Sequence, residues 1–544
     1  MPETVLQLDP RDNVLVALTP LAANTVVQFG QDTCPVTENI PAKHKLALAD
    51  FKPGDLIQMY GMVVGEATAA IPRGGLLSTR NVRHRAGAYT ATRQPVSFQL
   101  PDATAWKGRT FKGYHRADGQ VGTRNYWLVL PLVFCENRNV ERMKEALEEE
   151  LGYGGSHNSY RPLVRQLVER QSNGNGMSVS EAAAARSERV FHNVDGIRFL
   201  THQGGCGGTR QDAQALCGLL AGYIHHPNVA GATVLSLGCQ HSQASILMDE
   251  LRGRDPGMSK PVLMFDQQRS GRETVLMTNA LQKTFDGVVK ANSMTRSPAP
   301  LSALNVGLKC GGSDGFSGIS ANPTLGYISD LLGELGAKSL LSEFPELHGV
   351  EQEIINRCAS DELAQRFYDL MQTYSARAKA VDSGFEMNPS PGNIADGLIT
   401  DAIKSAGAAR KGGIASVRGV LDFPQYATTP GLNLLCTPGS DVECVTAQAG
   451  SGANLVLFTT GLGTPTGNPI APVVKISTNS TLAERMGDII DFDAGGIVTG
   501  ETTIPECAEK LLELCIEVAS GERLTKAELL GQNDFIPWKR GVSL

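Results

Sequence analysis

Three cysteines in this chain each have a glycine beside them, and each follows a predicted strand. They lie in residues 201–208 (THQGGCGG), 237–241 (LGCQH) and 309–315 (KCGGSDG). The first two of these loops lead into a helical pattern, and the third opens a second unit of the same kind. This repeated order of strand, glycine loop and helix predicts parallel α/β sheets, with ligand-facing loops at the carboxyl ends of the strands.

Glycine beside a thiol removes side-chain bulk and lets the backbone approach a ligand closely. A purely structural cysteine is accommodated equally well among Val and Leu. We therefore expect Cys206, Cys239 and Cys310 to face one shared pocket, where three thiolates would hold an iron–sulfur cluster with one open iron. The alternative is that these loops are tight strand-to-helix turns with small buried thiols.

Length and charge exclude several classes of protein. At 544 residues the chain is too long for one ordinary core, so two to four domains are expected. A net charge of −7 argues against a nucleic-acid-binding protein. No apolar run is long enough to span a bilayer, and the first residues do not resemble a signal peptide. Eleven scattered cysteines then predict reduced thiols and a cytoplasmic protein.

The pattern of apolar residues changes along the chain. Short strands at 13–18 and 56–60, separated by Pro and Gly, predict a small β-rich domain, whereas the longer apolar runs from Tyr126 onward predict strands buried on both faces. A helix is expected at 140–151. We therefore expect a β-rich domain at 1–88, a polar linker at 89–110, a first α/β lobe at 111–300 and a second α/β lobe at 301–544.

Several further motifs follow one another along the chain. They are residues 113–125 (GYHRADGQVGTRN), 237–239 (LGC), 310–319 (CGGSDGFSGI), 321–323 (ANP), 388–393 (NPSPGN), 430–435 (PGLNLL) and 491–495 (DFDAG). These motifs and their order resemble those of the altronate and galactarate dehydratase family. Together they cover nearly the whole chain, and the long Cys310 motif is highly specific. The N-terminal domain resembles the SAF domain of this family, with residues 40–48 (IPAKHKLAL) as its marker.

The resemblance implies a lyase of sugar-acid and hexuronate catabolism. Such a hydro-lyase converts a sugar acid to a 2-keto-3-deoxy acid, with ferrous iron as its usual activator. The chain departs from the family where a histidine cluster is expected near residues 77–81, because only His84 lies close by. The usual Gly-Asn-Lys and Gly-Cys-Glu of the family appear as residues 392–394 (GNI) and 238–240 (GCQ).

Dehydration of a 2,3-dihydroxy acid requires a carboxylate-binding group, a base for the C2 proton, and an acid or metal for the departing hydroxyl. Arg124 is the predicted carboxylate ligand, and its alternative is a salt bridge at a strand entry. His202 and His241 flank glycine loops and are candidate bases or acids. Lys475, inside an apolar strand, is a further candidate base, unless it lies on an edge strand.

The polyol chain of a sugar acid also needs hydroxyl-binding groups. We assign this role to Asn125, Ser313, Asp314, Ser390 and Asn393. Ser313 and Asp314 also suit the cap of a following helix, and the two roles are compatible.

Two iron sites are compatible with the sequence. Iron is held either by Cys206, Cys239 and Cys310, as a cluster, or by the SAF domain through His44, as a single ferrous ion. We favour the thiolate site, because one histidine with water and carboxylate oxygens is a poor iron cage.

The expected partner is a small-molecule sugar acid, and we expect no binding to nucleic acid or to a membrane. A homo-oligomer is compatible with the sequence. Two other functions remain open. The first is a sulfo-lyase that releases sulfite from sulfolactate or a similar 2-hydroxy acid. The second is a non-catalytic metabolite-binding protein.

Overall fold

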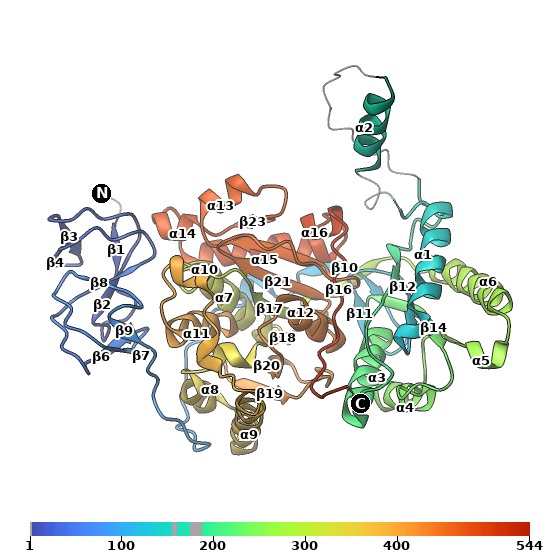
Figure 1. Cartoon of the computed structure of the whole chain (residues 1–544), viewed down its shortest axis with the longest axis horizontal. Helices are drawn as coiled ribbons and strands as arrows, with labels where there is room; N and C mark the ends of the chain where they lie inside the picture. The colour runs from blue at the N-terminus through green and yellow to red at the C-terminus, as the bar shows by residue number, and fades with distance from the viewer. Residues whose placement is uncertain (1–2, 155–159, 174–187, 544) are drawn as a thin grey trace.

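The structure is a computed structural model that describes residues 3–154, 160–173 and 188–543. Its parts lie in a row, with the N-terminal domain at one end, the second lobe in the middle and the first lobe at the other end (Figure 1). The second lobe therefore lies between the other two parts, although it comes last in the chain. Among the described residues, no helix is both long and apolar enough to cross a membrane.

The N-terminal domain is β-rich, as the sequence predicts. Its strands pair in antiparallel fashion in small sheets of order β1-β2-β5-β8, β6-β7-β9 and β3-β4. They are β1 (Val5–Leu6), β2 (Val14–Ala17), β3 (Val26–Phe29), β4 (Asp32–Pro35), β5 (Lys45–Ala47), β6 (Leu56–Met59), β7 (Met62–Ala67), β8 (Leu76–Leu77) and β9 (Val82–Arg83). Within the described ranges, none of them joins a sheet of either lobe.

The segment after this domain lies against the second lobe. The described residues 84–103 form no helix or strand, and Arg93 Nε lies 2.5 Å from the Asp361 carboxylate. After η1 (Thr104–Trp106) comes a small sheet that leads into both lobes. Its strands are β11 (Val121–Gly122), β10 (Thr110–His115) and β16 (Ser297–Pro300), in this order.

The first lobe is a parallel sheet of order β13-β12-β14-β15 with helices packed on it. Its strands are β12 (Tyr126–Pro131), β13 (Gly196–Phe199), β14 (Val229–Ser236) and β15 (Val262–Asp266). Its helices are η2 (Phe134–Glu136), α1 (Asn137–Glu150), α2 (Arg161–Asn173), α3 (Arg210–His225), α4 (Ala244–Arg254), α5 (Gln267–Ser270) and α6 (Glu273–Ala291).

The second lobe is a larger parallel sheet of order β19-β20-β18-β17-β21-β22-β23. Its strands are β17 (Asn305–Cys310), β18 (Lys338–Leu341), β19 (Val417–Leu421), β20 (Gly431–Leu435), β21 (Leu455–Thr460), β22 (Val473–Ser477) and β23 (Phe492–Asp493). Its helices are η3 (Leu301–Ala303), α7 (Ala321–Glu334), η4 (Phe344–Leu347), α8 (Glu351–Arg357), α9 (Asp361–Lys379), η5 (Phe385–Met387), α10 (Pro391–Ala395), α11 (Asp401–Ala409), η6 (Arg410–Gly412), α12 (Asp441–Gly450), α13 (Ser480–Arg485), α14 (Gly496–Thr499), α15 (Ile504–Ala519) and α16 (Lys526–Leu529).

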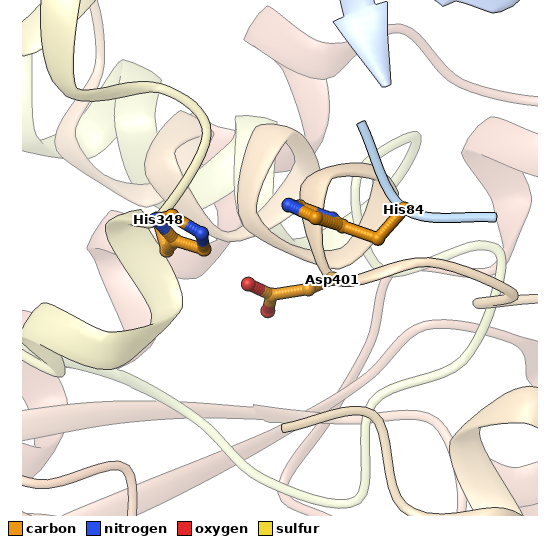
Figure 2. Close-up of side chains that lie close together, drawn as sticks. All are labelled: His84, His348 and Asp401. Carbon is orange, nitrogen blue, oxygen red and sulfur yellow. The ribbon is translucent and has the colours of Figure 1, made fainter. Parts of the chain in front are cut away.

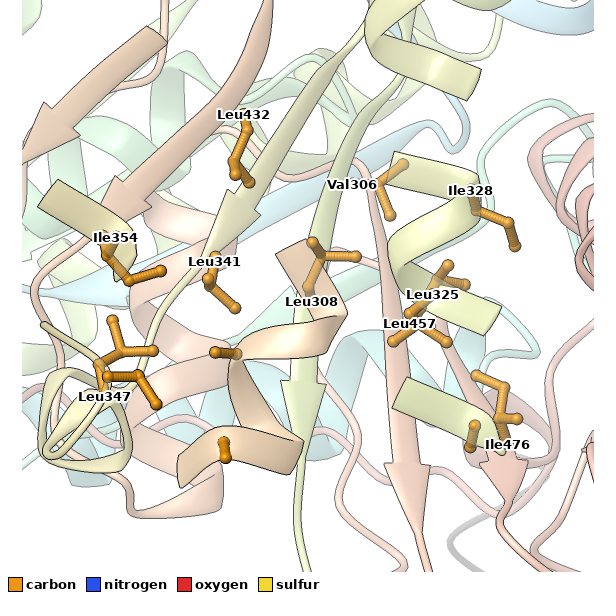
Figure 3. Packing of buried hydrophobic residues seen from close by; sticks show 14 of the residues in the cluster. Val306, Leu308, Leu325, Ile328, Leu341, Leu347, Ile354, Leu432, Leu457 and Ile476 are labelled. Atoms are coloured by element: carbon orange, nitrogen blue, oxygen red, sulfur yellow. The ribbon is translucent and has the colours of Figure 1, made fainter. Parts of the chain in front are cut away.

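The core of the second lobe explains its apolar strands. Side chains of β17, β18, β20, β21 and β22 pack against α7, η4 and α8, as Figure 3 shows for Leu308, Leu325 and Leu457. Every residue of β17, β21 and β22 is buried. A parallel sheet covered on both faces requires such continuous apolar runs, which is why the sequence predicts these strands well.

The order of strands fixes where this sheet can bind a ligand. From β17 the chain moves to one side through β18, and later passes to the other side of β17 through β21. Loops at the carboxyl ends of β17 and β21 therefore diverge, which makes the crevice where open α/β sheets bind ligands. The Cys310 loop lies at this position.

Candidate active site

A group of buried charged side chains surrounds Cys310 at the carboxyl end of β17. Its members come from β17, from the loop after β18, and from η4, α11, η6 and α12. We call it the Cys310 cluster, and it consists of Lys309, Cys310, Glu343, Glu346, Lys404, Lys411 and Asp441.

The thiol lies between an ammonium group and a carboxylate. Lys411 Nζ is 2.9 Å from Cys310 Sγ, and Cys310 Sγ is 3.3 Å from Glu346 Oε2. Lys404 Nζ is 2.8 Å from the other oxygen of Glu346 and donates to Asn388 Oδ1 at 2.9 Å. A chain of polar contacts therefore runs from Lys411 through the thiol to Lys404.

Glu343 anchors the inner half of the cluster. It bonds to Lys309, and its second oxygen lies 2.6 Å from Lys411 Nζ. Glu343 adopts a left-handed backbone conformation, with φ of 68°, directly after β18. Such strain in a non-glycine residue persists only where the surroundings hold it, and here two buried ammonium groups do so. Lys309 also lies 2.9 Å from Asp441.

Burial and charge set the protonation states of this cluster. Burial raises the pKa of the Cys310 thiol to about 12, with Lys411 opposing, so the thiol keeps its proton near neutral pH. Burial alone would raise the pKa of Glu346, but Lys404, Lys309 and Lys411 hold it well below its usual value. The cluster meets solvent at Asp441, whose side chain is 28 % exposed, and slightly at Lys404.

The N-terminal domain contributes to the same edge of the sheet. Lys43 Nζ lies 3.0 Å from Asp314 and 2.9 Å from Asp396, and both carboxylates belong to the second lobe. A Cβ on Gly315 would lie 2.6 Å from the Lys43 carbonyl oxygen, and one on Gly397 would lie 2.4 Å from it. These glycines therefore allow the loop around Lys43 to reach Asp314.

Ser313, Asp314 and Asn393 are buried at this edge, but largely as structural groups, whereas Ser390 is exposed. Asp314 accepts hydrogen bonds from Ser317 and Thr478. Ser390 caps α10 together with Asn393, and Asn393 Nδ2 donates to the Ser313 carbonyl at 2.7 Å. The turn at 388–393 thus holds the Cys310 loop in place.

Arg124 forms the salt bridge that was its alternative in the sequence, and Asn125 also makes structural contacts. The Arg124 guanidinium makes a two-point contact with Glu528, at 2.7 and 3.0 Å, and donates to the carbonyls of Thr123 and Val518. All three of its nitrogens are thereby engaged, far from the Cys310 cluster in the fold. The Asn125 side chain likewise bonds to the carbonyls of Asn193 and Ala291.

The two histidine candidates lie in the first lobe, beside Cys206. His202 is buried, and its ring nitrogens contact the Pro131 carbonyl at 2.9 Å and the Gly204 N–H at 3.1 Å. His202 therefore fixes the glycine loop. His241 and Cys206 line a cavity of about 870 Å³ between the lobes, which the C-terminal residues 535–539 also line.

The structure does not bring the three predicted thiol ligands together. Three groups of His, Cys, Asp or Glu donor atoms within 4.8 Å of one another occur in the described chain, and none contains two of these cysteines. Cys206 and Cys239 are exposed in the first lobe, whereas Cys310 is buried in the second. The glycines around Cys206 serve a close backbone contact instead, since a Cβ on Gly205 would lie 2.2 Å from the Leu132 carbonyl oxygen.

The remaining two candidates, Lys475 and His44, also form contacts within the protein. Lys475 lies in the interior strand β22, where its ammonium group bonds to the Thr466 carbonyl and burial lowers its pKa to about 8. His44 contacts the Ala42 carbonyl at 3.2 Å. Burial lowers the pKa of His44, with Lys45 and Lys43 adding to the effect, so the ring is neutral.

Sequence reasoning missed most of the Cys310 cluster. Glu343, Glu346, Lys404 and Lys411 lie 33 to 101 residues from Cys310 and within no glycine-framed motif. The available signal was weak: Lys404 and Lys411 flank a run of small residues, 405–409 (SAGAA). Such a run gives no indication that these lysines are buried.

Comparison with known proteins identifies the family. Residues 3–85 match the altronate/galactarate dehydratase SAF domain, residues 113–292 match the second domain of D-galactarate dehydratase/altronate hydrolase, and residues 301–543 match the C-terminal region of D-galactarate/altronate dehydratase. The chain belongs to the altronate/galactarate dehydratase family.

Relatives of known activity span all or most of the chain. Altronate dehydratase of Escherichia coli is 32 % identical over 543 residues, which are 99 % of each chain. Galactarate dehydratase (L-threo-forming) of the same organism is 32 % identical over 97 % of this chain and 94 % of its own. The (2R)-sulfolactate sulfo-lyase subunit beta of Chromohalobacter salexigens is 33 % identical over 79 % of this chain and 97 % of its own.

Proposed function

We propose that this protein is a carbon–oxygen lyase that dehydrates a sugar acid to a 2-keto-3-deoxy acid at the Cys310 cluster. Full-length similarity to altronate and galactarate dehydratases supports the reaction class. One observation supports the location: a protonated thiol and an ionised carboxylate lie 3.3 Å apart among three lysines, at the switch point of the second-lobe sheet.

The lysines suit the charge that develops in this reaction. Removal of the C2 proton from a sugar acid places a second negative charge next to the carboxylate. Lys404 and Lys411 supply positive charge on both sides of the Glu346–Cys310 pair. Ammonium groups held in a dry site stabilise such charge more strongly than water does.

Glu346 is the proposed base and Cys310 the proposed acid. Glu346 takes the C2 proton, and the electron pair forms the C2–C3 double bond as the C3–O bond breaks. The Cys310 thiol gives its proton to the departing hydroxyl, which leaves as water. Glu346 then returns its proton to the thiolate across 3.3 Å, and the enol product becomes the 2-keto acid in water.

Substrate binding would strengthen the base. In the structure, Lys404 lowers the pKa of Glu346. When Lys404 turns toward the substrate carboxylate, this influence weakens, and the pKa of Glu346 rises toward values useful for proton removal. The slight exposure of Lys404 is consistent with such a movement.

The predicted iron ligands do not fit the metal that the resemblance implies. The three thiols form no common group of donors within 4.8 Å in the described chain, and His44 is part of no such group. Cys310, Glu343 and Glu346 do form such a group, but each carboxylate already contacts a lysine. A cation there would meet three ammonium groups, so we route no step through a metal at this position.

The sulfo-lyase alternative rests on the relative that releases sulfite. Sulfite is a much better leaving group than hydroxide and needs no proton from a thiol. The two reactions therefore make different demands on Cys310, although both need the C2 base. A metabolite-binding protein without activity would need neither group.

An anaerobic assay against aldonates, aldarates and sulfolactate, which measures both 2-keto acid and sulfite, distinguishes these functions. We expect 2-keto acid from a sugar acid, and losses of about 10²–10⁴-fold in kcat for Cys310→Ser and Glu346→Gln. Cys206→Ser is the matched control, because this exposed thiol lies outside the cluster. Sulfite production with an active Cys310→Ser variant would favour the sulfo-lyase, and full activity of both variants would exclude the proposed site.

We also propose that the protein acts in the cytoplasm. All eleven of its cysteines are free thiols, which suits a reducing compartment.

A further inference from the structure

Two histidines and an aspartate converge where the segment after the N-terminal domain meets the second lobe. His84 lies directly after β9, His348 follows η4, and Asp401 is the first residue of α11. One donor atom from each side chain lies within 4.8 Å of those of the other two. Figure 2 shows the two rings and the carboxylate approaching one another from these three segments.

Asp401 is buried without a hydrogen-bond partner. Its residue is 1 % exposed, and neither carboxylate oxygen has a hydrogen-bond partner in the described chain. A buried carboxylate that lacks hydrogen bonds is rare, and one that faces two imidazoles lacks only a cation to satisfy it.

His348 is oriented as metal-binding histidines are. Its Nδ1 lies 2.8 Å from Glu351 Oε1, so Nδ1 donates to this carboxylate and Nε2 is the nitrogen left for a metal ion. The ring stacks on His84 at 5.3 Å between centroids. A carboxylate on the outer nitrogen fixes the tautomer and makes the other nitrogen a better ligand.

His84 is held only weakly. Its Nδ1 accepts a hydrogen bond from the Ala402 N–H at 3.4 Å, which is long for such a bond. A metal ion on Nδ1 uses the lone pair that accepts this bond, and a metal ion on Nε2 leaves the ring proton on Nδ1. In either case the contact with Ala402 is lost.

We propose that His84, His348 and Asp401 bind one divalent first-row transition-metal ion, with Glu351 orienting His348. Two imidazoles and one carboxylate suit Fe²⁺, Zn²⁺, Mn²⁺ or Co²⁺, whereas Mg²⁺ and Ca²⁺ prefer oxygen ligands alone. Three protein ligands leave room for water at the ion. This site goes beyond the proposed reaction and does not depend on it.

The ion would connect two functional parts of the molecule. His84 would be tied to the second lobe, close to where the N-terminal domain ends. Asp401 lies one helical turn before Lys404, and His348 lies two residues after Glu346. A bound ion would therefore hold α11 and η4, the two elements that place Lys404 beside Glu346.

The test is metal binding by the chelator-stripped full-length protein, measured anaerobically. We expect one equivalent of Co²⁺ with visible absorption typical of nitrogen and oxygen ligands, and binding of Zn²⁺ and Fe²⁺ in competition with it. His84→Ala, His348→Ala and Asp401→Asn should abolish stoichiometric binding, and Glu351→Gln should weaken it by about 10–100-fold. His115→Ala is the matched control, because this exposed histidine contacts only the Pro298 carbonyl.

Two results would overturn the proposal. One is the absence of Co²⁺, Zn²⁺ and Fe²⁺ binding by the wild-type protein. The other is retention of the ion by a His84→Ala/His348→Ala variant. Asp401→Asn shows whether a loss of binding is caused by misfolding. This substitution removes a buried carboxyl group that lacks hydrogen bonds. The free energy of unfolding of the metal-free variant should therefore be no lower than that of the metal-free wild type. A Cys206→Ser/Cys239→Ser/Cys310→Ser variant should still bind Co²⁺.

Discussion

Arg124 shows how one buried ion pair can resemble a substrate ligand in the sequence. Its guanidinium joins the first lobe to Glu528 near the end of the chain, and both side chains are largely buried. Because removal of one partner leaves an uncompensated charge, Arg124→Met should lower the free energy of unfolding by about 3–5 kcal/mol. Arg124→Met/Glu528→Leu should recover most of this loss. Urea unfolding measures both.

The same variants test the role of Arg124 in binding. If Arg124 holds the substrate carboxylate, the double variant should have a greatly raised KM despite its restored stability. We expect KM to stay within about threefold of the wild type, since every Arg124 nitrogen is already bonded within the protein.

At the residue scale, the sequence predicted the loop of the site but not its partners. Cys310 stood out because glycine frames it, and glycine reports backbone geometry directly. Glu346 and Lys411 are ordinary residues in ordinary segments, and only the fold brings them to the thiol. Cys206 and Cys239 carried the same glycine signal, but in the first lobe Gly205 lies against the Leu132 carbonyl and Gly238 adopts a φ of 121° beside the Gln268 side chain.

At the scale of elements, glycine controls how the N-terminal domain meets the second lobe. Gly315→Ala places a Cβ 2.6 Å from the Lys43 carbonyl oxygen, so the loop around Lys43 must move away from Asp314. We expect a loss of stability of about 1–3 kcal/mol together with reduced turnover. Thermal unfolding and the dehydratase assay measure these two effects.

Gly253→Ala is the control for this variant. It lies in α4, and a Cβ there meets no atom within 4 Å. Alanine is the better helix former, so this variant should be neutral or slightly stabilised. Unchanged turnover and stability in Gly315→Ala would show that the Lys43 loop does not need its present position.

The elements that the sequence predicted best are strands in which every residue is buried. β12, β17 and β21 are buried throughout, and they account for the long apolar runs from Tyr126 onward that predict strands buried on both faces. β16 was missed, because Pro298 and Pro300 make residues 297–300 look like a loop. The structure tolerates them since β16 pairs on one side only, with β10.

At the scale of the molecule, the chain order does not reveal that the second lobe lies in the middle (Figure 1). Strand patterns report each sheet separately, whereas docking depends on polar contacts between distant residues. His226 of the first lobe is one such contact, since its Nε2 lies 2.9 Å from the Ala453 carbonyl of the second lobe. Its Nδ1 accepts a hydrogen bond from the Asn228 N–H at 3.0 Å.

This histidine should make the docking of the lobes sensitive to acid. Burial lowers the pKa of His226 to about 3, and Lys260, His225 and Arg116 add to the effect, against the hydrogen bond to Ala453. Between pH 6.5 and about 3 the unfolded chain therefore binds a proton that the folded chain does not. The contribution of His226 to stability is fully present above pH 6.5 and is lost as the pH falls, by up to about 1.4 kcal/mol per pH unit.

A comparison of the wild type with His226→Gln isolates this contribution. Glutamine can keep a hydrogen bond to the Ala453 carbonyl but does not titrate. We expect the urea midpoint of the wild type to fall more steeply between pH 6.5 and 4.5 than that of the variant. Acid-sensitive groups elsewhere, including His225 with its pKa lowered to about 4 by burial, act equally in both proteins. If the urea midpoints of the two proteins fall in parallel with pH, His226 is not neutral in the folded state. Other contacts would then make the docking of the lobes depend on pH.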